Sequence, residues 1–164
     1  MKLLKLLPCL AVFALLAAAQ DHRSLCLFLD LNMSAADQSR AQDAAIKFVE
    51  QRTTPSDQVT IMTFTTEVKV IEDFTGDRAL LVASLRKIAP YLPAAAPNSA
   101  SRLQALQNAA AMLGGTPGKK QLVYFARPDS RPVTGDLDLV MATVAAAERA
   151  NVAFYPVNVQ DLPR

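Results

Sequence analysis

Short apolar runs and stretches of helical period alternate along the chain after residue 20. Residues 24–30 form a continuous apolar run that ends in a carboxylate, which is typical of a strand covered on both faces. Ser34 is placed to cap a helix that runs through Arg52, with Ala41, Ala45, Phe48 and Val49 on its apolar face. Further strands are predicted at 59–64, 68–70, 122–126 and 152–159. Further helices are predicted to begin at Asp77, near 98–101, and at Asp136 or Asp138, the last with Val140, Val144 and Ala147 inward.

This order of elements predicts an α/β fold with a mostly parallel sheet and helices on both of its faces. The segment 68–70 follows the preceding strand after a two-residue turn, so we expect it to be an antiparallel, half-exposed edge strand. Pro156 has no N–H to donate, so the last strand is predicted to lie at an edge or to be irregular there. The pattern indicates one domain without internal repeats.

The first nineteen residues have the pattern of a secretory signal peptide. Lys2 and Lys5 form a positive start, residues 6–19 are apolar and uncharged, and small residues at 17–19 favour cleavage before Gln20. The apolar run is shorter than the roughly 20 residues that span a bilayer. We therefore predict a signal peptide at 1–19, a domain at 20–164 without a transmembrane segment after cleavage, and a secreted or periplasmic location.

Net charge limits the partners that we expect, and cysteine content limits the disulfides that the domain can form. The chain has 17 basic and 15 acidic residues, and the net charge of +2 disappears once Lys2 and Lys5 are removed. A neutral domain gives no electrostatic basis for binding nucleic acid or an anionic membrane. After cleavage only Cys26 remains, within an apolar run, so we expect a buried structural thiol and no internal disulfide.

The clearest candidate chemistry follows the first strand. Asp30, Asn32 and Ser34 place oxygen-bearing side chains at alternate positions, and such oxygens suit Mg²⁺, Ca²⁺ or Mn²⁺. In the alternative interpretation, Asp30 simply ends the strand while Asn32 and Ser34 form a turn and a helix cap. The spacing alone favours this second interpretation.

These five residues resemble a known motif. Asp30-Leu-Asn-Met-Ser34 is similar to the Asp-x-Ser-x-Ser metal-ion-dependent adhesion motif of von Willebrand factor A domains, with Asn32 at the first serine. Segments 57–64, 120–125 and 151–158 resemble the second, fourth and fifth strands of that family, and the likeness extends over residues 24–162. It is nearest to the "VWFA-related" group of secreted bacterial proteins of acidobacterial type. The resemblance implies a three-layer Rossmann-like sandwich with strand order 3-2-1-4-5, the third strand antiparallel, and a domain shortened at its C-terminus.

The resemblance also implies a site for one divalent cation, Mg²⁺, Ca²⁺ or Mn²⁺, completed by an acidic residue of a protein partner. Asp30 would hold the cation through water, Asn32 and Ser34 would bind it directly, and Asp129 would be an outer carboxylate. Either Ser99 or Ser101 would stand where the family has a threonine. Arg127 places a positive charge near the predicted cation, so the resemblance indicates a partly degenerate site.

Catalytic motifs point away from an enzyme. The chain has no Gly-x-Ser-x-Gly elbow, its one histidine is His22 near the predicted cleavage site, and its glycines form no phosphate-binding loop. We therefore expect a non-enzymatic interaction or adhesion module. A metal-free interaction or assembly module, and a divalent-metal-dependent hydrolase using Asp30, are the alternatives. The oligomeric state stays open.

Overall fold

The computed structural model describes residues 23–93, 97–127 and 137–162. The predicted signal peptide and Asp129 lie outside these residues. The described elements are, in chain order, β1 (Ser24–Asp30), α1 (Ala35–Arg52), β2 (Gln58–Phe64), β3 (Val68–Thr75), α2 (Arg78–Arg86), α3 (Ser99–Gly114), β4 (Lys120–Ala126), α4 (Leu137–Ala150), β5 (Val152–Asn158) and the 3-10 turn η2 (Val159–Asp161).

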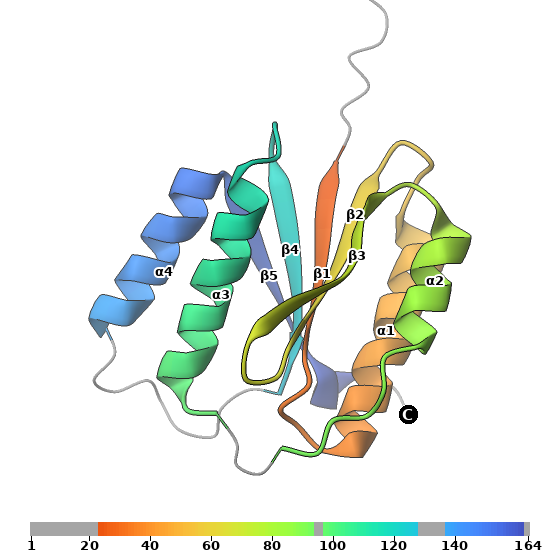
Figure 1. Ribbon diagram of the computed structural model, residues 1–164, viewed down its shortest axis with the longest axis horizontal. Coiled ribbons are helices and arrows are strands. Elements are labelled where there is room, and N and C mark those ends of the chain that lie inside the picture. The colour runs from red at the N-terminus through yellow and green to blue at the C-terminus, as the bar shows by residue number, and fades with distance from the viewer. Residues whose placement is uncertain (1–22, 94–96, 128–136, 163–164) are drawn as a thin grey trace, which may run out of the picture.

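The strands form one sheet in the order β3-β2-β1-β4-β5 (Figure 1). β1 pairs in parallel with both β2 and β4, β4 pairs in parallel with β5, and only β2 and β3 are antiparallel. The predicted fold class and strand order are therefore confirmed. The four parallel strands end together at Asp30, Phe64, Ala126 and Asn158, and we call this side of the sheet the carboxyl edge.

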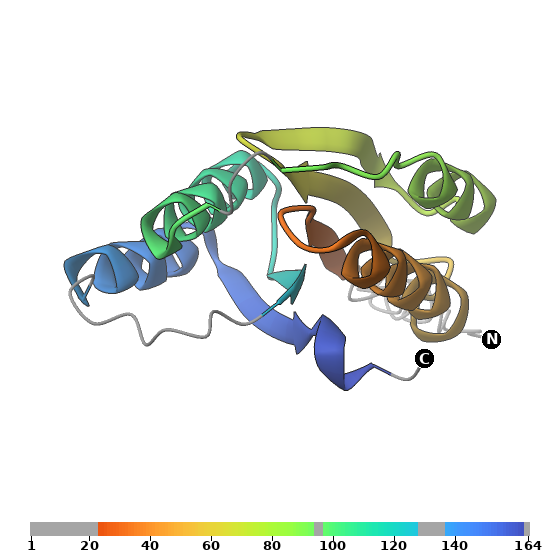
Figure 2. The ribbon, with the colours of Figure 1, turned by 90° about the horizontal axis from the view of Figure 1, so that it is seen from below.

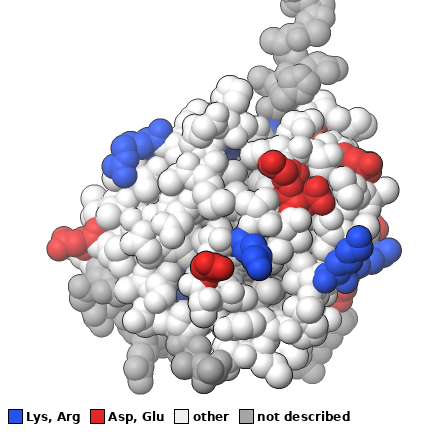
Figure 3. Space-filling model, in the orientation of Figure 1, with Lys and Arg blue, Asp and Glu red and all other residues white. Residues whose placement is uncertain are grey.

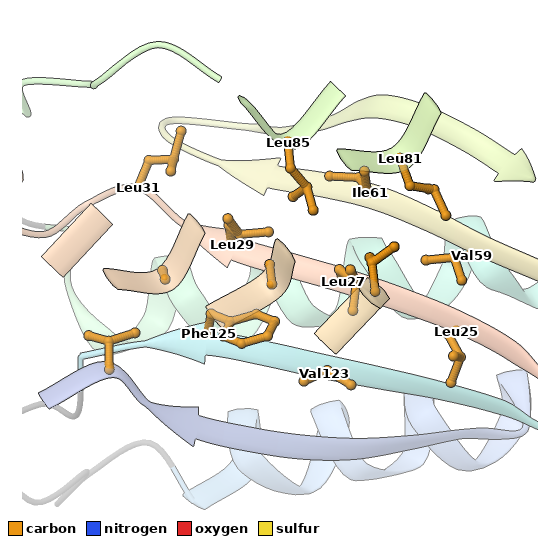
Figure 4. Close-up of a cluster of buried hydrophobic side chains, with 14 of the residues drawn as sticks. Leu25, Leu27, Leu29, Leu31, Val59, Ile61, Leu81, Leu85, Val123 and Phe125 are labelled. Atoms are coloured by element: carbon orange, nitrogen blue, oxygen red, sulfur yellow. The ribbon is translucent and has the colours of Figure 1, made fainter. Parts of the chain in front are cut away.

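Two helical layers cover the sheet (Figure 2). The odd-numbered residues of β1, Leu25, Leu27 and Leu29, pack against α1 and α2 in one buried cluster (Figure 4). The even-numbered Cys26 and Phe28 face the opposite way, toward α3 and α4. A strand buried on both faces explains why its sequence is a continuous apolar run rather than an alternating one. The alternation also decides that Asp30 points to the α3 side.

Two local predictions need correction. β3 extends from Val68 to Thr75 rather than over 68–70, because the register shifts against β2 and lets pairing continue to Val59↔Thr75. In α4 the buried positions are Thr143, Ala147 and Ala150, whereas Val144 is 45% exposed and does not point inward. The buried Thr143 hydroxyl is satisfied, because it accepts a hydrogen bond from Gln107 of α3 and donates one to the carbonyl of Leu139.

Several other predictions are confirmed. Ser34 and Asp77 each cap a helix through a side-chain oxygen, as predicted, and the third helix begins at Ser99, within the predicted range 98–101, with Asn98 as its cap. Pro156 lies in β5, which is an edge strand of the described sheet. Cys26 is buried, and burial raises the pKa of its thiol, so it is a packing residue rather than a nucleophile. Among the described helices, none combines the length and apolar character needed to cross a membrane.

Candidate functional site

The site is centred on Asp30, the last residue of the central strand β1. Asp30 is 1% exposed, and its side chain lies on the face of the sheet covered by α3. A buried carboxylate requires donors or an opposite charge, because burial without them is costly. The residues around Asp30 therefore show which groups compensate its negative charge.

Four donors from three residues surround this carboxylate. Its Oδ1 accepts from the backbone N–H of Asn32 at 2.9 Å and from the Asn32 side-chain amide at 3.0 Å. Its Oδ2 accepts from Arg102 Nε at 2.9 Å and from the Tyr124 hydroxyl at 3.2 Å. An ionised carboxylate offers about four lone-pair sites. The four donors therefore saturate Asp30.

Arg102 reaches Asp30 from 72 residues further along the chain. It lies in the first turns of α3, whose start is fixed by the side chain of Asn98 accepting from the Ser101 backbone N–H at 2.8 Å. The parallel sheet and this helix bring the start of α3 beside the carboxyl edge (Figures 1 and 2). The ion pair is well enclosed, since the side chains of Arg102 and Asp30 are 13% and 2% exposed.

Asn32 ties the end of β1 to the turn between β2 and β3. Its side-chain amide donates to the backbone carbonyls of Phe64 at 3.2 Å and Thr65 at 2.7 Å, as well as to Asp30. The side chain is buried, with 6% of its surface exposed. Asn32 therefore acts as a donor that holds the loop in place, which is the turn role that the spacing favoured.

Ser34 lies at the other end of this loop and caps α1. Its hydroxyl accepts from the backbone N–H of Asp37 at 3.2 Å and donates to Asp37 Oδ2 at 2.8 Å. Asp37 Oδ1 in turn accepts from Arg40 at 3.1 Å. The capping interpretation of Ser34 is therefore confirmed.

The two candidate serines of α3 have different surroundings. Ser99 is the first residue of the helix and lines a groove described below, while Ser101 is exposed and donates to the Asn98 side chain at 2.9 Å. The next residue, Arg102, makes the contact with Asp30. Sequence reasoning missed Arg102. A signal for it existed, since Arg102 is the only charged residue of α3.

The described residues do not fit a divalent cation at Asp30 in this arrangement. The carboxylate is saturated by donors, the Asn32 amide nitrogen faces it, and the Ser34 hydroxyl is engaged with Asp37. Within residues 23–93, 97–127 and 137–162, no group of three or more His, Cys, Asp or Glu side chains is arranged to hold a metal. The predicted ligand set of Asp30, Asn32, Ser34, Ser99, Ser101 and Asp129 stays a prediction.

A small groove opens beside the ion pair, between α3 and the carboxyl ends of β4 and β5. Its volume is about 230 Å³, and apolar side chains such as Leu103, Leu106 and Val157 line most of it. Arg102 and Arg127 add positive charge. Pockets for drug-sized ligands start at about 300 Å³, so this groove suits one or two side chains of a partner better.

The opposite edge of the sheet carries a second arginine–aspartate pair. Arg23 donates from Nε to Asp57 Oδ1 at 2.9 Å and from Nη2 to Oδ2 at 2.7 Å. Burial alone would raise the pKa of Asp57, but hydrogen bonds from Arg23 and Thr54, together with the charge of Arg23, lower it overall. The Arg23 side chain is 44% exposed, so this pair is open to solvent on one side.

Residues 28–127, more than half of the chain, match the von Willebrand factor type A domain family. The chain belongs to this family. The match begins inside β1 and ends just after β4, so it contains both partners of the Asp30–Arg102 pair. Members of this family are in general interaction modules, and the match supports that general role for this type A domain. The narrower likeness to the acidobacterial group stays a prediction.

One solved structure supports the fold of this type A domain. The crystal structure of the conserved hypothetical protein BatB from Bacteroides thetaiotaomicron is 18% identical, with a TM-score of 0.62, over 82% of this chain and 65% of that one. The von Willebrand factor domain of the type V pili tip protein Mfa5 from Porphyromonas gingivalis is 17% identical, with a TM-score of 0.48, over 70% and 43%. The chain therefore spans less than two thirds of either structure. Comparison with curated protein sequences gives no match.

Proposed function

We propose that this chain is a secreted, non-enzymatic module that binds a protein partner at the carboxyl edge of its sheet. The groove beside the Asp30–Arg102 pair is the observation that carries the proposal. It is apolar, it is sized for one or two side chains, and it lies outside the carboxyl ends of parallel strands, where open α/β sheets bind ligands. Secretion rests on the signal-peptide pattern of residues 1–19.

The charges around the groove define the expected partner. In the view of Figure 3, the surface over α3 and α4 is largely uncharged, and most charged side chains of the described residues lie nearer the centre and the right. Arg127 is exposed at the rim of the groove, and Arg102 lines it. We expect a partner segment that places an apolar side chain in the groove and a carboxylate near Arg127.

Selection of peptides from a random phage-displayed library, on the purified chain, tests this proposal. The selected sequences should combine an acidic and an apolar residue, and their affinities are then measured by isothermal titration calorimetry. Leu103→Ser removes an apolar wall of the groove and should weaken binding about tenfold, the effect of roughly 1.4 kcal/mol. Arg127→Ala should weaken the binding of peptides with an acidic residue more than the binding of peptides without one.

Leu80→Ser is the matched control, because Leu80 is a 43% exposed leucine of α2, which packs on the other face of the sheet. Binding that is equal in Leu103→Ser, Leu80→Ser and the unaltered chain would contradict a partner site at the groove. Circular dichroism spectra of the three proteins should agree, which shows that any loss is local.

Self-association through β5 is a second candidate function. β5 is an edge strand among the described elements, and Tyr155 on it is 48% exposed. Pro156 opposes strand pairing because it has no N–H to donate. Light scattering across a concentration series tests this candidate, which requires a dimer that Tyr155→Lys dissociates.

A further inference from the structure

The positive charge beside Asp30 belongs to the chain itself. The guanidinium of Arg102 donates to Asp30 Oδ2 at 2.9 Å, and both side chains are largely enclosed. We propose that Arg102 fills the cation position of this type A domain, so that the carboxyl edge is assembled without a divalent cation. The proposal concerns the same edge as the proposed function, but it is tested without a partner.

The Asp30 carboxylate is fully occupied by hydrogen-bond donors of the chain. Each oxygen of Asp30 already accepts two hydrogen bonds, from Asn32 on one side and from Arg102 and Tyr124 on the other. A cation, or a water molecule bound to one, would have to displace one of these donors. The guanidinium supplies the opposite charge that the buried carboxylate needs, and it stays charged at every physiological pH.

The surroundings hold this arrangement in place. The Tyr124 ring packs against Phe28, with ring centroids 5.5 Å apart and a 60° angle between the rings. Asn32 is fixed by two backbone carbonyls, and Arg102 projects from a helix whose start is capped by Asn98. The donors to Asp30 are therefore oriented by contacts independent of the carboxylate itself.

The hydroxyl of Ser34 supports the same conclusion from the other end of the loop. Its oxygen accepts from the N–H of Asp37 and donates to the Asp37 carboxylate, so the orientation of Ser34 is set by the start of α1. Asp37 is itself paired with Arg40. The polar side chains at this end of the loop are therefore satisfied by helix capping and an ion pair within the chain.

Titration of the purified chain with Mn²⁺, followed by electron paramagnetic resonance of the free ion, tests the proposal. We expect no saturable binding up to about 1 mM, the weak end of extracellular cation sites. The midpoint temperature of unfolding, Tm, should be the same in EDTA and in Mn²⁺. Saturable binding by the unaltered chain that disappears in Asp30→Ala would overturn the proposal. Saturable binding by the unaltered chain, accompanied by a higher Tm in Mn²⁺ than in EDTA, would overturn it even if Asp30→Ala does not fold.

The variant Arg102→Ser provides a second test, because it removes the guanidinium from the proposed cation position beside Asp30. This variant should unfold at a lower Tm in EDTA, should bind Mn²⁺ at least tenfold more tightly than the unaltered chain, and should regain part of its Tm with the ion. The double variant Asp30→Ala, Arg102→Ser should lose that response. Arg149→Ser, at an exposed arginine in the last turn of α4, is the matched control and should remain unresponsive.

A folded Arg102→Ser variant that ignores Mn²⁺ would also overturn the proposal, because the arginine would then not be standing in a cation position. Neither outcome depends on peptide binding. A failure here is thus distinguishable from a failure of the partner site at the groove.

Discussion

The carboxyl edge of the sheet and the opposite end, where the parallel strands begin and which we call the amino edge, each carry an arginine–aspartate pair. The two pairs differ in what they connect. At the amino edge, Arg23 binds Asp57 through two hydrogen bonds and also donates to the carbonyl of Arg52, while Asp57 accepts from the backbone N–H of Thr54. This pair joins the start of β1 to the turn between α1 and β2. Its arginine is 44% exposed.

At the carboxyl edge, the pair is enclosed and joins side chains from different layers. Arg102 of α3 and Tyr124 of β4 meet Asp30 at the end of β1, and the Arg102 side chain is only 13% exposed. The amino-edge pair closes a loop, whereas the carboxyl-edge pair balances a charge beside an open groove. The two carboxylates are equally buried, so the pairs differ in the exposure of their arginines and in the segments that they join.

The largest expected effect distinguishes the two arginines by stability. Arg102→Met should lower the free energy of unfolding by about 3–5 kcal/mol, because it leaves Asp30 buried without its opposite charge. Arg23→Met should lower it less, by about 1–3 kcal/mol, because Asp57 is buried as well but Arg23 is 44% exposed, so water can replace part of its contacts. Urea unfolding followed by circular dichroism measures both. Equal losses would show that enclosure does not separate the two pairs.

A double variant provides the control for this result. Asp30→Asn combined with Arg102→Met removes both charges, so it should recover a large part of the stability lost in Arg102→Met alone. No recovery would mean that lost packing of the arginine stem, rather than the unpaired charge, causes the effect.

The next effect concerns Ser34 at the carboxyl edge. Ser34→Ala should lower the free energy of unfolding by about 1 kcal/mol, since it removes the N-cap of α1. Ser34→Thr should retain most of the stability, because threonine keeps a hydroxyl that can cap the helix and donate to the Asp37 carboxylate. Thermal unfolding of both variants measures this, and equal destabilisation by the two substitutions would contradict the capping role.

The pH dependence of stability should reveal the amino-edge pair. The pKa of Asp57 is lowered in the folded chain, so its stabilising contribution is present above the unfolded pKa of about 3.9. That contribution is lost as the pH falls through the lower, folded pKa. The difference in unfolding free energy between the unaltered chain and Asp57→Asn should therefore shrink in acid. A difference that stayed constant would contradict the lowered pKa.

Salt should have the smallest effect and should act on one edge only. Raising NaCl to about 1 M shortens the screening length to about 3 Å, which weakens solvent-exposed charge pairs by tenths of a kcal/mol. The stability difference between the unaltered chain and Arg23→Met should therefore decrease with salt. The difference for Arg102→Met should hardly change, and the same salt sensitivity at both edges would contradict the difference in enclosure.

Much of the fold was predictable because its signals are local. The continuous apolar run of β1, the caps Ser34 and Asp77, and the position of Pro156 each follow from a few neighbouring residues. The length of β3 was not predictable, because a register shift against β2 sets it. The exposure of Val144 was missed because Gln107 of α3 makes the neighbouring Thr143 the buried position.

The candidate site divides in the same way. The sequence by itself determined that Asp30 ends a buried strand, that Asn32 and Ser34 follow it, and that the chain resembles the type A family. Only the tertiary structure decided that Arg102 donates to Asp30. Capping and strand burial are set within a few residues, whereas this ion pair joins groups 72 positions apart, which only sheet order and helix packing bring together.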